Sequence, residues 1–408
     1  MTRQVYDGIR ILDFTQFQQG PVGTQLLADF GAEVIKIERP GAGDGFRGGK
    51  SGRGGFGSGF IACNRNKKSL TLNLKDPRAV KIVRDLAKIS DVVAANFRPG
   101  VMEKLGLGYE DLSAINPRII CAYATGYGLT GPDRDTLGQD MMAQCRAGLV
   151  RGNPPRTCGY NIVDQFGGVL LATGVMLALA AREKTGRGQV VDTNLLNTAL
   201  QADQMGATAY LNGSYGKPKD AMAAQAAAPA DGSPKRYRGN PTYALYEAKG
   251  GRWVHVIDAF RDRPAARQLK AMGYADAVAD DPRFADVHNL TAEAGEELKG
   301  LIARAVAGMT PAEVVERFKT QDMMAVPVRW YDEAFEDPQV LHNQMILEAE
   351  HPLAGTVRML GFPIKLMGTP ATLRRPPPVL GEHNDEILGG LLGLGAAEIE
   401  ALKKDGVV

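Results

Sequence analysis

The sequence predicts an α/β protein whose larger domain has a parallel sheet with helices on both faces. Strand and helix signals alternate through the first 200 residues, as they do when parallel strands are joined by helical crossovers. From about 214 to 238 the chain is rich in Ala, Pro, Gly and Lys, which is typical of a linker. A hairpin pattern over 242–257 and helical patterns from 259 to about 322 then predict a smaller α+β domain.

Local patterns predict the elements of the larger domain. Short apolar and β-branched runs predict strands over 8–14, 33–40, 91–97 and 118–128. A helix is expected over 22–30, and another begins at Asp76, which can cap it before Pro77 at the first helical position. An apolar helix is expected over about 165–183, and strand character returns at 326–331.

Composition and charge exclude several classes of protein. The 408 residues carry a formal net charge of +2, so no nucleic-acid partner is expected. The four cysteines show no CxxC spacing and the first 254 residues contain no histidine, which argues against disulfides or zinc and for a reducing compartment. The N-terminus has no signal-peptide pattern, and the apolar run 169–181 is too short to span a bilayer. We therefore expect a cytoplasmic protein with no membrane partner.

The first strand–turn–helix–strand unit of the chain has features of a nucleotide-binding unit. Gly20 and Gly23 could form a turn whose backbone N–H groups bind an anion, and Glu38 ends the second strand. The glycines do not match GxGxxG, however, and Pro21 lacks an N–H. Arg39 beside Glu38 suits a phosphate better than two ribose hydroxyls. An ordinary turn in an α/β unit is the alternative interpretation.

The segment 36–68 has a high density of positive charge, because only two acidic residues accompany its basic ones. Taken alone, RGGKSGRGG is similar to RNA-binding Arg-Gly segments, but those are usually disordered tails and this one lies between two expected core strands. We expect a flexible basic loop that binds a phosphorylated small molecule, with a merely solvated loop as the alternative. The basic residues are Lys36, Arg39, Arg47, Lys50, Arg53, Arg65, Lys67 and Lys68.

Two carboxylates, Asp140 and Asp164, occur within apolar segments about 24 residues apart. A buried unpaired charge is costly, so each needs a partner, a helix end or a chemical function. The two could act as an acid and a base, or as a nucleophile with a neighbour. Capping is the usual function of an Asp that precedes a helix. A metal site would need further ligands, and no histidine is near in the sequence.

Four stretches of the chain resemble family III CoA-transferases, which include formyl-CoA and carnitine CoA-transferases and α-methylacyl-CoA racemases. They are LDFTQFQQGPVGTQLLADFGAEVIKIERP, NRNKKSLTLNLKDP, NFRPGVMEKLGLGYEDLSAINPRII and AREKTGRGQVVD, and the similarity returns near PPPVLGEHNDEIL. The resemblance implies a Rossmann-like large domain from both chain ends, 1–213 and 326–408, with a linker at 214–238 and a small domain at 239–325. It also implies an interlocked homodimer with the active site where the domains meet.

Asp164 lies at the position of the family's catalytic aspartate, and the resemblance implies its mechanism. In the transferases this carboxylate attacks an acyl-CoA thioester, and a mixed anhydride and then an enzyme–CoA thioester follow. The implied partners are acyl-CoA and a small carboxylic acid, with coenzyme A as a substrate and no metal or redox cofactor. A helix N-terminus would stabilise the ionised carboxylate by about 0.3–1 kcal/mol, and apolar neighbours would reduce its hydration.

Other positions match the family one by one. Gln18 matches a glutamine that faces the reacting acyl group and can donate to a developing oxyanion. Asp140 matches an acidic residue close to the nucleophile. The resemblance also implies a set of residues that contact CoA, in which Lys104 replaces an arginine of the formyl-CoA enzyme. This set is Arg39, Leu72, Asn96, Phe97 and Lys104.

Departures from the family pattern bear on the reaction. The racemases have a histidine where this chain has Gln139, and a glutamine cannot exchange a proton near neutral pH. A glutamate of the racemases' small-domain hairpin matches Ala244 here. The consecutive glycines over the active site of the formyl-CoA enzyme are replaced by RYRGNPTY, in which Gly239 and Asn240 could substitute in part.

The main hypothesis is an acyl-CoA:carboxylate CoA-transferase with Asp164 as nucleophile. An α-methylacyl-CoA racemase or epimerase is the second hypothesis, and a non-catalytic CoA-binding protein is the third. An NAD-dependent dehydrogenase is least expected, because the glycine fingerprint is missing. The sequence does not identify the donor and acceptor acids.

Overall fold

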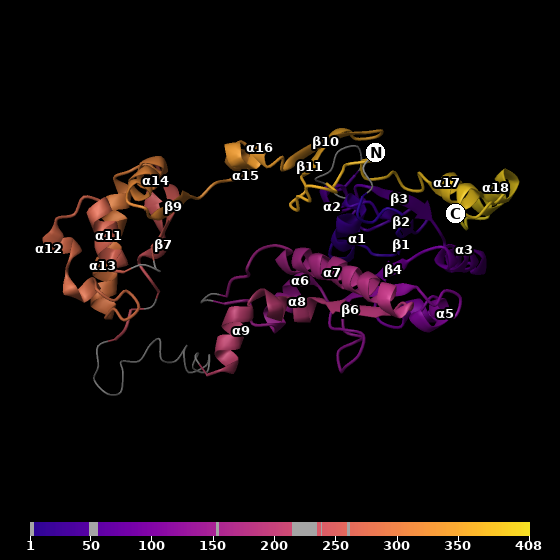
Figure 1. The fold of residues 1–408 in the computed structure, drawn as a ribbon, viewed down its shortest axis with the longest axis horizontal. Coiled ribbons are helices and arrows are strands. Elements are labelled where there is room, and N and C mark those ends of the chain that lie inside the picture. The colour runs from indigo at the N-terminus through magenta and orange to yellow at the C-terminus, as the bar shows by residue number, and fades with distance from the viewer. Residues whose placement is uncertain (1–3, 49–55, 152–154, 214–234, 238, 259–261) are drawn as a thin grey trace. The chain divides into compact units, whose positions relative to one another are not determined.

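The structure is a computed structural model that describes residues 4–48, 56–151, 155–213, 235–237, 239–258 and 262–408. The chain forms two compact units (Figure 1). The larger comprises Met1–Leu211 and Leu341–Val408, and the smaller comprises Asn212–Val340. The expected linker at 214–238 lies almost wholly outside the described residues.

The larger unit contains a sheet of six parallel strands in the order β3-β2-β1-β4-β5-β6. The chain first moves outward from β1 to β3 and then continues on the other side of β1. Folds with this doubly wound order bind ligands outside the carboxyl ends of the strands, beside the point where the order reverses. The predicted parallel sheet is confirmed. Its strands are β1 (Arg10–Asp13), β2 (Glu33–Glu38), β3 (Lys67–Thr71), β4 (Val92–Ala95), β5 (Ile120–Thr125) and β6 (Val190–Asn194).

Helices cover both faces of this sheet, because successive residues of a strand point to opposite faces. Ile11 and Val34 pack with apolar residues of α1 and α7, whereas Leu12 and Ile35 pack with residues of α3, α17 and α18 (Figure 1). The helices of this unit are α1 (Gln19–Asp29), α2 (Ser58–Cys63), α3 (Pro77–Lys88), α4 (Val101–Lys104), α5 (Tyr109–Ser113), α6 (Asp140–Arg146), α7 (Ile162–Thr185), α8 (Leu195–Ala202), α9 (Gln204–Leu211), α17 (Asn384–Gly390) and α18 (Ala396–Lys404).

Helix α7 is the longest apolar element of the described chain. Among the described residues it is the one helix long and apolar enough, by length and composition alone, to cross a membrane. The run 169–181, which the sequence suggested was too short for this, is part of a helix of 24 residues. Within the unit, α7 packs against α1, β5 and β6. Its buried Arg182 pairs with Asp91 at 2.9 Å near the last turn.

Helix α1 crosses α7 at close range because both helices have glycine at the contact. A Cβ atom at Gly23 would lie 2.7 Å from the backbone oxygen of Gly168. A Cβ atom at Gly168 would lie 2.7 Å from the backbone oxygen of Gln19. Gly20 and Gly23 lie inside α1, so the turn that the sequence suggested at these residues is wrong.

Most of the positive charge at 36–68 is neutralised inside the fold. The Lys36–Asp44 pair, at 2.8 Å, and the Lys67–Asp13 pair, at 3.0 Å, have fully buried side chains. Further pairs are Arg47–Glu38, Arg65–Asp29 and Lys68–Glu33. The expected phosphate-binding function is wrong for these side chains, because each of them pairs with a carboxylate of the same segment or of the chain before it. Lys50 and Arg53 lie outside the described residues.

The smaller unit combines an antiparallel sheet with a group of helices. Its strands β7 (Tyr243–Ala248) and β8 (Arg252–Ile257) form the expected hairpin, and β9 (Met324–Pro327) pairs with β8. Because of this pairing, residues 326–340 lie in the smaller unit, and the larger unit resumes at Leu341. Its helices are α11 (Pro264–Ala271), α12 (Asp276–Ala279), the 3-10 helix Pro282–Phe284, α13 (Ala292–Ala307), α14 (Pro311–Thr320) and α15 (Tyr331–Phe335).

The remaining elements follow the smaller unit. Helix α16 (Pro338–His342) crosses the boundary between the two units. Strands β10 (Ile346–His351) and β11 (Gly355–Leu360) then form an antiparallel hairpin of the larger unit. The chain after this hairpin contacts the sheet again, since the backbone N–H of Asn66 donates to the oxygen of Arg375 at 3.1 Å.

Replacing Gly23 by Ala should destabilise the larger unit, because the added methyl group would lie 2.7 Å from the backbone oxygen of Gly168 in α7 and would also crowd the side chain of Leu171. Overpacking of this kind costs about 1–3 kcal/mol, which thermal or denaturant unfolding would measure as a lower stability. Gly389→Ala in α17 is the matched control, since its Cβ would come no closer than 3.7 Å, to Ile399. Equal stability of Gly23→Ala and wild type would contradict the close crossing.

Candidate active site

Asp164 lies in the first turn of α7, one turn before the glycines that contact α1. Its side chain is partly buried. The helix begins after Asn161, whose φ of 56° lies in the left-handed region. This conformation is uncommon for residues other than glycine, although Asn tolerates it better than most. Backbone strain of this kind is concentrated at functional sites.

Asp140 caps α7 from outside that helix. It is the first residue of α6, and its carboxylate is almost fully buried. Its Oδ2 accepts hydrogen bonds from the backbone N–H groups of Val163 and Asp164, at 2.7 and 2.9 Å. Its Oδ1 accepts from Nε2 of Gln144 at 2.6 Å. The side chain of Asn161, at the usual capping position, makes no capping bond. Of the two carboxylates that the sequence suggested as possible caps, Asp140 is therefore the one that caps α7.

The two carboxyl groups determine how Asp164 titrates. Burial raises the pKa of Asp164, and the negative charge of Asp140 raises it further, to about 7. The expectation that the amides of the first helical turn stabilise a charged Asp164 needs correction, because two of these amides already donate to Asp140. Asp164 therefore exchanges its proton near neutral pH. Shifts of this size are typical of groups that take part in chemistry.

Gln18 is held against the start of α7 by a side-chain hydrogen bond. It occupies the N-cap position of α1, and its Oε1 accepts from Nδ2 of Asn161 at 2.7 Å. This bond orients the amide, so its Nε2 points away from Asn161. Within the described residues Nε2 has no protein acceptor. Phe17, immediately before, has a left-handed φ of 62°. Gln18 thus presents an unused donor at the same helix start as Asp164.

A buried polar network fixes the loop that carries Gln18. Lys36 donates through Nζ to the backbone oxygen of Thr15 at 2.7 Å, and Asp44 accepts from the backbone N–H of Phe17 at 3.0 Å. Asp13 accepts from the N–H and the hydroxyl of Thr15. Burial alone would raise the pKa of Asp13, but Lys67, Lys36 and the hydroxyl donors lower it to about 2. The Asp13 carboxylate that holds Thr15 therefore stays ionised at neutral pH.

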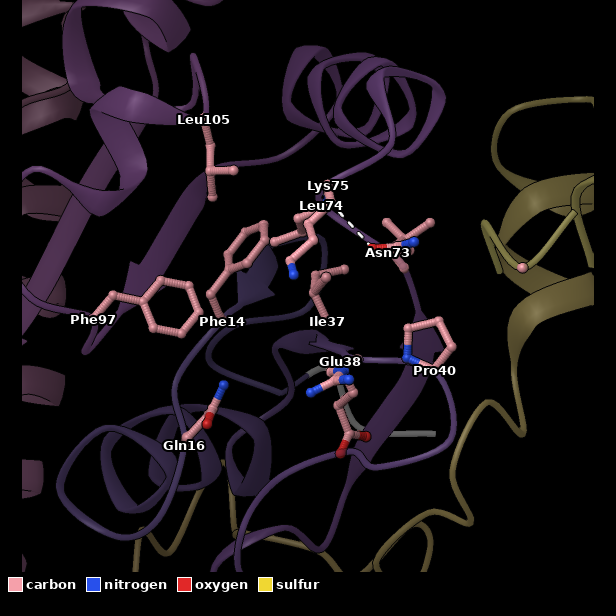
Figure 2. Close-up of a pocket in the computed structure, with 13 residues that line it drawn as sticks. Phe14, Gln16, Ile37, Glu38, Pro40, Asn73, Leu74, Lys75, Phe97 and Leu105 are labelled. Carbon is pink, nitrogen blue, oxygen red and sulfur yellow. Dashed lines mark hydrogen bonds between the residues drawn. The ribbon is translucent and has the colours of Figure 1, made fainter.

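A pocket of about 520 Å³ lies at the carboxyl ends of β1 to β4 (Figure 2). Phe14 and Phe97, whose ring centroids are 6.5 Å apart, form its apolar wall with Leu72. Exposed Arg39 and Lys75 provide positive charge at its edge. A pocket with an apolar wall and two cations fits a nucleotide with phosphates. Its position, beside the point where the strand order reverses, is where doubly wound folds bind ligands.

Three of the five expected CoA-binding residues line the pocket, and the other two do not. Arg39, Leu72 and Phe97 line the pocket together. Asn96 does not, because its side chain exchanges two hydrogen bonds, at 2.8 and 2.7 Å, with the backbone of Gln16. Lys104 ends α4 and lies next to the lining residue Leu105, but is not itself a lining residue. Asn96 therefore shapes the pocket indirectly, through the loop between β1 and α1.

Sequence reasoning missed three polar residues of the site. Gln144 is four residues after Asp140, a spacing that places both on one face of a helix and could have indicated the contact. Asn161 carried a weaker signal, an Asn just before a helix. Lys75 follows β3 as Arg39 follows β2. Because the carboxyl ends of parallel strands meet at one edge of a sheet, the sequence could have indicated that these two cations lie in the same site. No group of three metal-binding side chains occurs among the described residues.

The family model of CoA-transferase family III matches residues 6–384. The chain belongs to this family, as its motifs indicated. It is therefore a CoA-transferase, an enzyme that transfers CoA between carboxylic acids.

Several relatives match along almost the whole chain. The succinyl-CoA:glutarate CoA-transferase of Mus musculus is 33% identical, covering 98% of this chain and 90% of that protein. The formyl-CoA:oxalate CoA-transferase of Rhodopseudomonas palustris is 32% identical, covering 98% and 97%. The crystal structure of a CAIB/BAIF family protein from Brucella suis superposes with a TM-score of 0.78 at 27% identity, covering 95% of this chain and 100% of that one. The crystal structure of a hypothetical protein from Mycobacterium tuberculosis superposes with a TM-score of 0.77 at 30% identity. The match covers 95% of this chain and 99% of that one.

Asp140→Asn should lower the pKa of Asp164 below about 7, because it removes a negative charge and leaves an oxygen that can still accept from the α7 amides. Carbodiimide reacts with protonated carboxyl groups, so labelling of Asp164, followed by peptide mass, should fall as the pH rises through about 7. In Asp140→Asn the midpoint should move to lower pH. Asp85→Asn, at a half-buried carboxylate of α3, is the control. A midpoint that stays in place would contradict the coupling.

Proposed function

We propose that this enzyme moves CoA between acids through a covalent intermediate on Asp164. The observation that carries the proposal is the environment of this carboxyl group. It is partly buried, it has a pKa of about 7, and it lies where the starts of α1 and α7 meet. A carboxylate that is poorly hydrated and ionised at neutral pH is a suitable nucleophile.

The reaction proceeds by four substitutions at carbonyl carbons, two for the donor and two for the acceptor. The Asp164 carboxylate attacks the thioester carbonyl of the donor, and CoA leaves as a thiolate, so that a mixed anhydride remains. The thiolate then attacks the aspartyl carbonyl, the donor acid leaves as a carboxylate, and an aspartyl–CoA thioester remains. The acceptor carboxylate attacks this thioester, and the same steps in reverse order give the new acyl-CoA and free Asp164.

The neighbouring side chains have distinct functions in this scheme. Gln18 donates through Nε2 to the carbonyl oxygen that becomes negative during each attack; one such donor is typically worth about 10²–10³ in rate. Asp140 is a positioning residue, which fixes the first turn of α7 and raises the pKa of the nucleophile. The higher pKa makes Asp164 a better nucleophile when ionised and keeps about half of it ionised at neutral pH.

The pocket at the strand ends binds the nucleotide part of CoA. Arg39 and Lys75 contact phosphates, and Phe14 and Phe97 contact the adenine. The pantetheine arm then passes from Gln16, which lines the pocket, towards Gln18 two residues later. Two residues of extended chain span at most about 7 Å, so the pocket and the reaction centre belong to one site. We also propose that Lys104 acts as a weaker phosphate contact at its edge.

The names of the relatives support a substrate class. They include transferases named for succinyl-CoA with glutarate, D-citramalate or L-malate as the second acid. We therefore propose succinyl-CoA as donor and a dicarboxylic acid as acceptor. The racemase alternative is less well supported, because Gln139, at the N-cap of α6, provides no titratable group beside Asp140. Solvent deuterium entering the α-position of an acyl-CoA would support that alternative instead.

We further propose an interlocked homodimer in the cytoplasm that uses no metal or redox cofactor. Large apolar side chains on α9 and around α15 support a second copy, since Met205, Leu211, Trp330 and Tyr331 are each more than three-quarters exposed. Exposed large apolar side chains that gather on one element are typical of an interface, and each unit by itself carries such a group. Sedimentation of the protein as a monomer would contradict the dimer.

Asp164→Ala should abolish the covalent intermediate. After mixing with succinyl-CoA and a trapping step with borohydride or hydroxylamine, wild type should show a modified Asp164 in its intact and peptide mass, and the variant should not. Turnover should fall by at least about 10³-fold, as when a nucleophile is removed. Asp133→Ala, at an exposed carboxylate beside α6, is the control. An identical adduct on Asp164→Ala would place the nucleophile elsewhere.

Arg39→Ala should weaken CoA binding by about tenfold, since a charge-assisted contact to a phosphate is lost. The affinity for free CoA is measured by calorimetry. Because exposed charges are screened by salt, the difference from wild type should shrink at high ionic strength. Arg78→Ala, on α3 and outside the pocket lining, should leave the affinity unchanged. Equal affinities of wild type and Arg39→Ala would remove Arg39 from the site.

A further inference from the structure

The side chain of Gln19 is buried without a partner. It is the first residue of α1, only 4% exposed, and its Nε2 has no hydrogen-bond partner in the described structure. Gln25, on the same helix, shows the ordinary arrangement. Its Nε2 donates to the backbone oxygen of Ala62 at 3.1 Å, and its Oε1 accepts from the N–H of Arg65 at 3.0 Å. Leaving a buried donor unpaired is costly, so such a group calls for an explanation.

The unpaired amide lies on the face of α7 that carries Asp164. A Cβ atom at Gly167 would lie 2.8 Å from Nε2 of Gln19, so the amide packs directly on that glycine. Gly167 follows Asp164 by three residues, and residues three apart on a helix are neighbours on one face, with Cβ atoms about 5–6 Å apart. Any larger residue at position 167 would displace the amide.

The two glutamines contact α7 on either side of Asp164. Gln18 bonds to Asn161, three residues before Asp164, and Gln19 packs on Gly167, three residues after it. Asp164 and Gly167 therefore share one face at the start of α7, and Asn161 is the N-cap immediately before it. Two adjacent amides with unused N–H donors contact this helix start from the start of α1.

We propose that Gln19 is a second catalytic donor, whose carboxamide hydrogen-bonds to the carbonyl oxygen of the acyl group at Asp164. The inference rests on the proposed function of Asp164 and adds a residue to it. As the Asp164 carboxylate attacks the thioester, the electron pair of the carbonyl moves onto its oxygen, which then accepts from Gln18 and from Gln19. No covalent bond forms to Gln19, and its amide keeps its protons. Paired donors aimed at a developing oxyanion stabilise it strongly in a water-poor site.

Gln19→Met tests the proposal, because methionine has nearly the same shape and lacks the donor. Adduct formation with succinyl-CoA should slow by about 10–100-fold. The Tm should equal or exceed that of wild type, since replacing an unpaired buried amide by an apolar group removes no bond. Gln25→Met is the matched control, for which we expect a change in Tm and no change in rate. Its Tm should fall, because both amide atoms are bonded, and its rate of adduct formation should stay within about twofold of wild type.

Two outcomes would overturn the inference. An unchanged rate of adduct formation in Gln19→Met would show that the amide does not contact the reacting group. A fall in Tm as large as that of Gln25→Met would show that the amide supports the fold instead.

A failure of the proposed function is recognised separately. If wild type forms no adduct, binding decides the case for Gln19 in an Asp164→Ala background. In that background, Gln19→Met should weaken the binding of succinyl-CoA by about 5–10-fold and leave the affinity for free CoA unchanged. Equal effects on the two ligands, or no effect on either, would reject Gln19 as a contact of the acyl group.

Discussion

The close contact of α1 with α7 is the constraint on which the site depends. These helices are separated by more than a hundred residues, yet glycines at positions 23, 167 and 168 let them approach until backbone meets backbone or side chain. Gln18 and Asp164 both lie within one turn of this contact. A displacement of about 1 Å in a catalytic geometry can cost about 10²-fold in rate. The glycines therefore set the distance between Gln18 and Asp164, the proposed donor and the proposed nucleophile, although they have no side chain that could react.

Asp140 joins a structural function to an electrostatic one. Its carboxylate holds the first turn of α7 through two backbone amides, and this same negative charge raises the pKa of Asp164. Gln144 completes the arrangement, since it binds Oδ1 of Asp140 and the backbone oxygen of Gly159. A cap formed by an uncharged side chain would hold the helix but would leave Asp164 more acidic. The stability of the helix start and the basicity of the nucleophile thus depend on one group.

Much of the fold could be predicted from local patterns, because a parallel sheet requires alternating strands and helices and buried apolar runs. The family motifs likewise located Asp164 and the pocket residues Arg39, Leu72 and Phe97. Long-range pairing could not be predicted. Charge density at 36–68 indicated a phosphate site, but Lys67 and Arg65 are neutralised by Asp13 and Asp29, which only the folded chain brings near. Gly23 fitted a turn as well as a helix crossing, since glycine suits both.

The residues at positions 18 and 161, far apart in the sequence, constrain each other. The left-handed backbone of Asn161 favours glycine or asparagine, and its amide orients Gln18. Glycine would relax the backbone but free the Gln18 side chain, whereas aspartate would present an oxygen and turn the Gln18 amide around. A change at either position therefore alters the requirement at the other. Positions 18 and 161 should covary among related sequences, even where the residues around them drift independently.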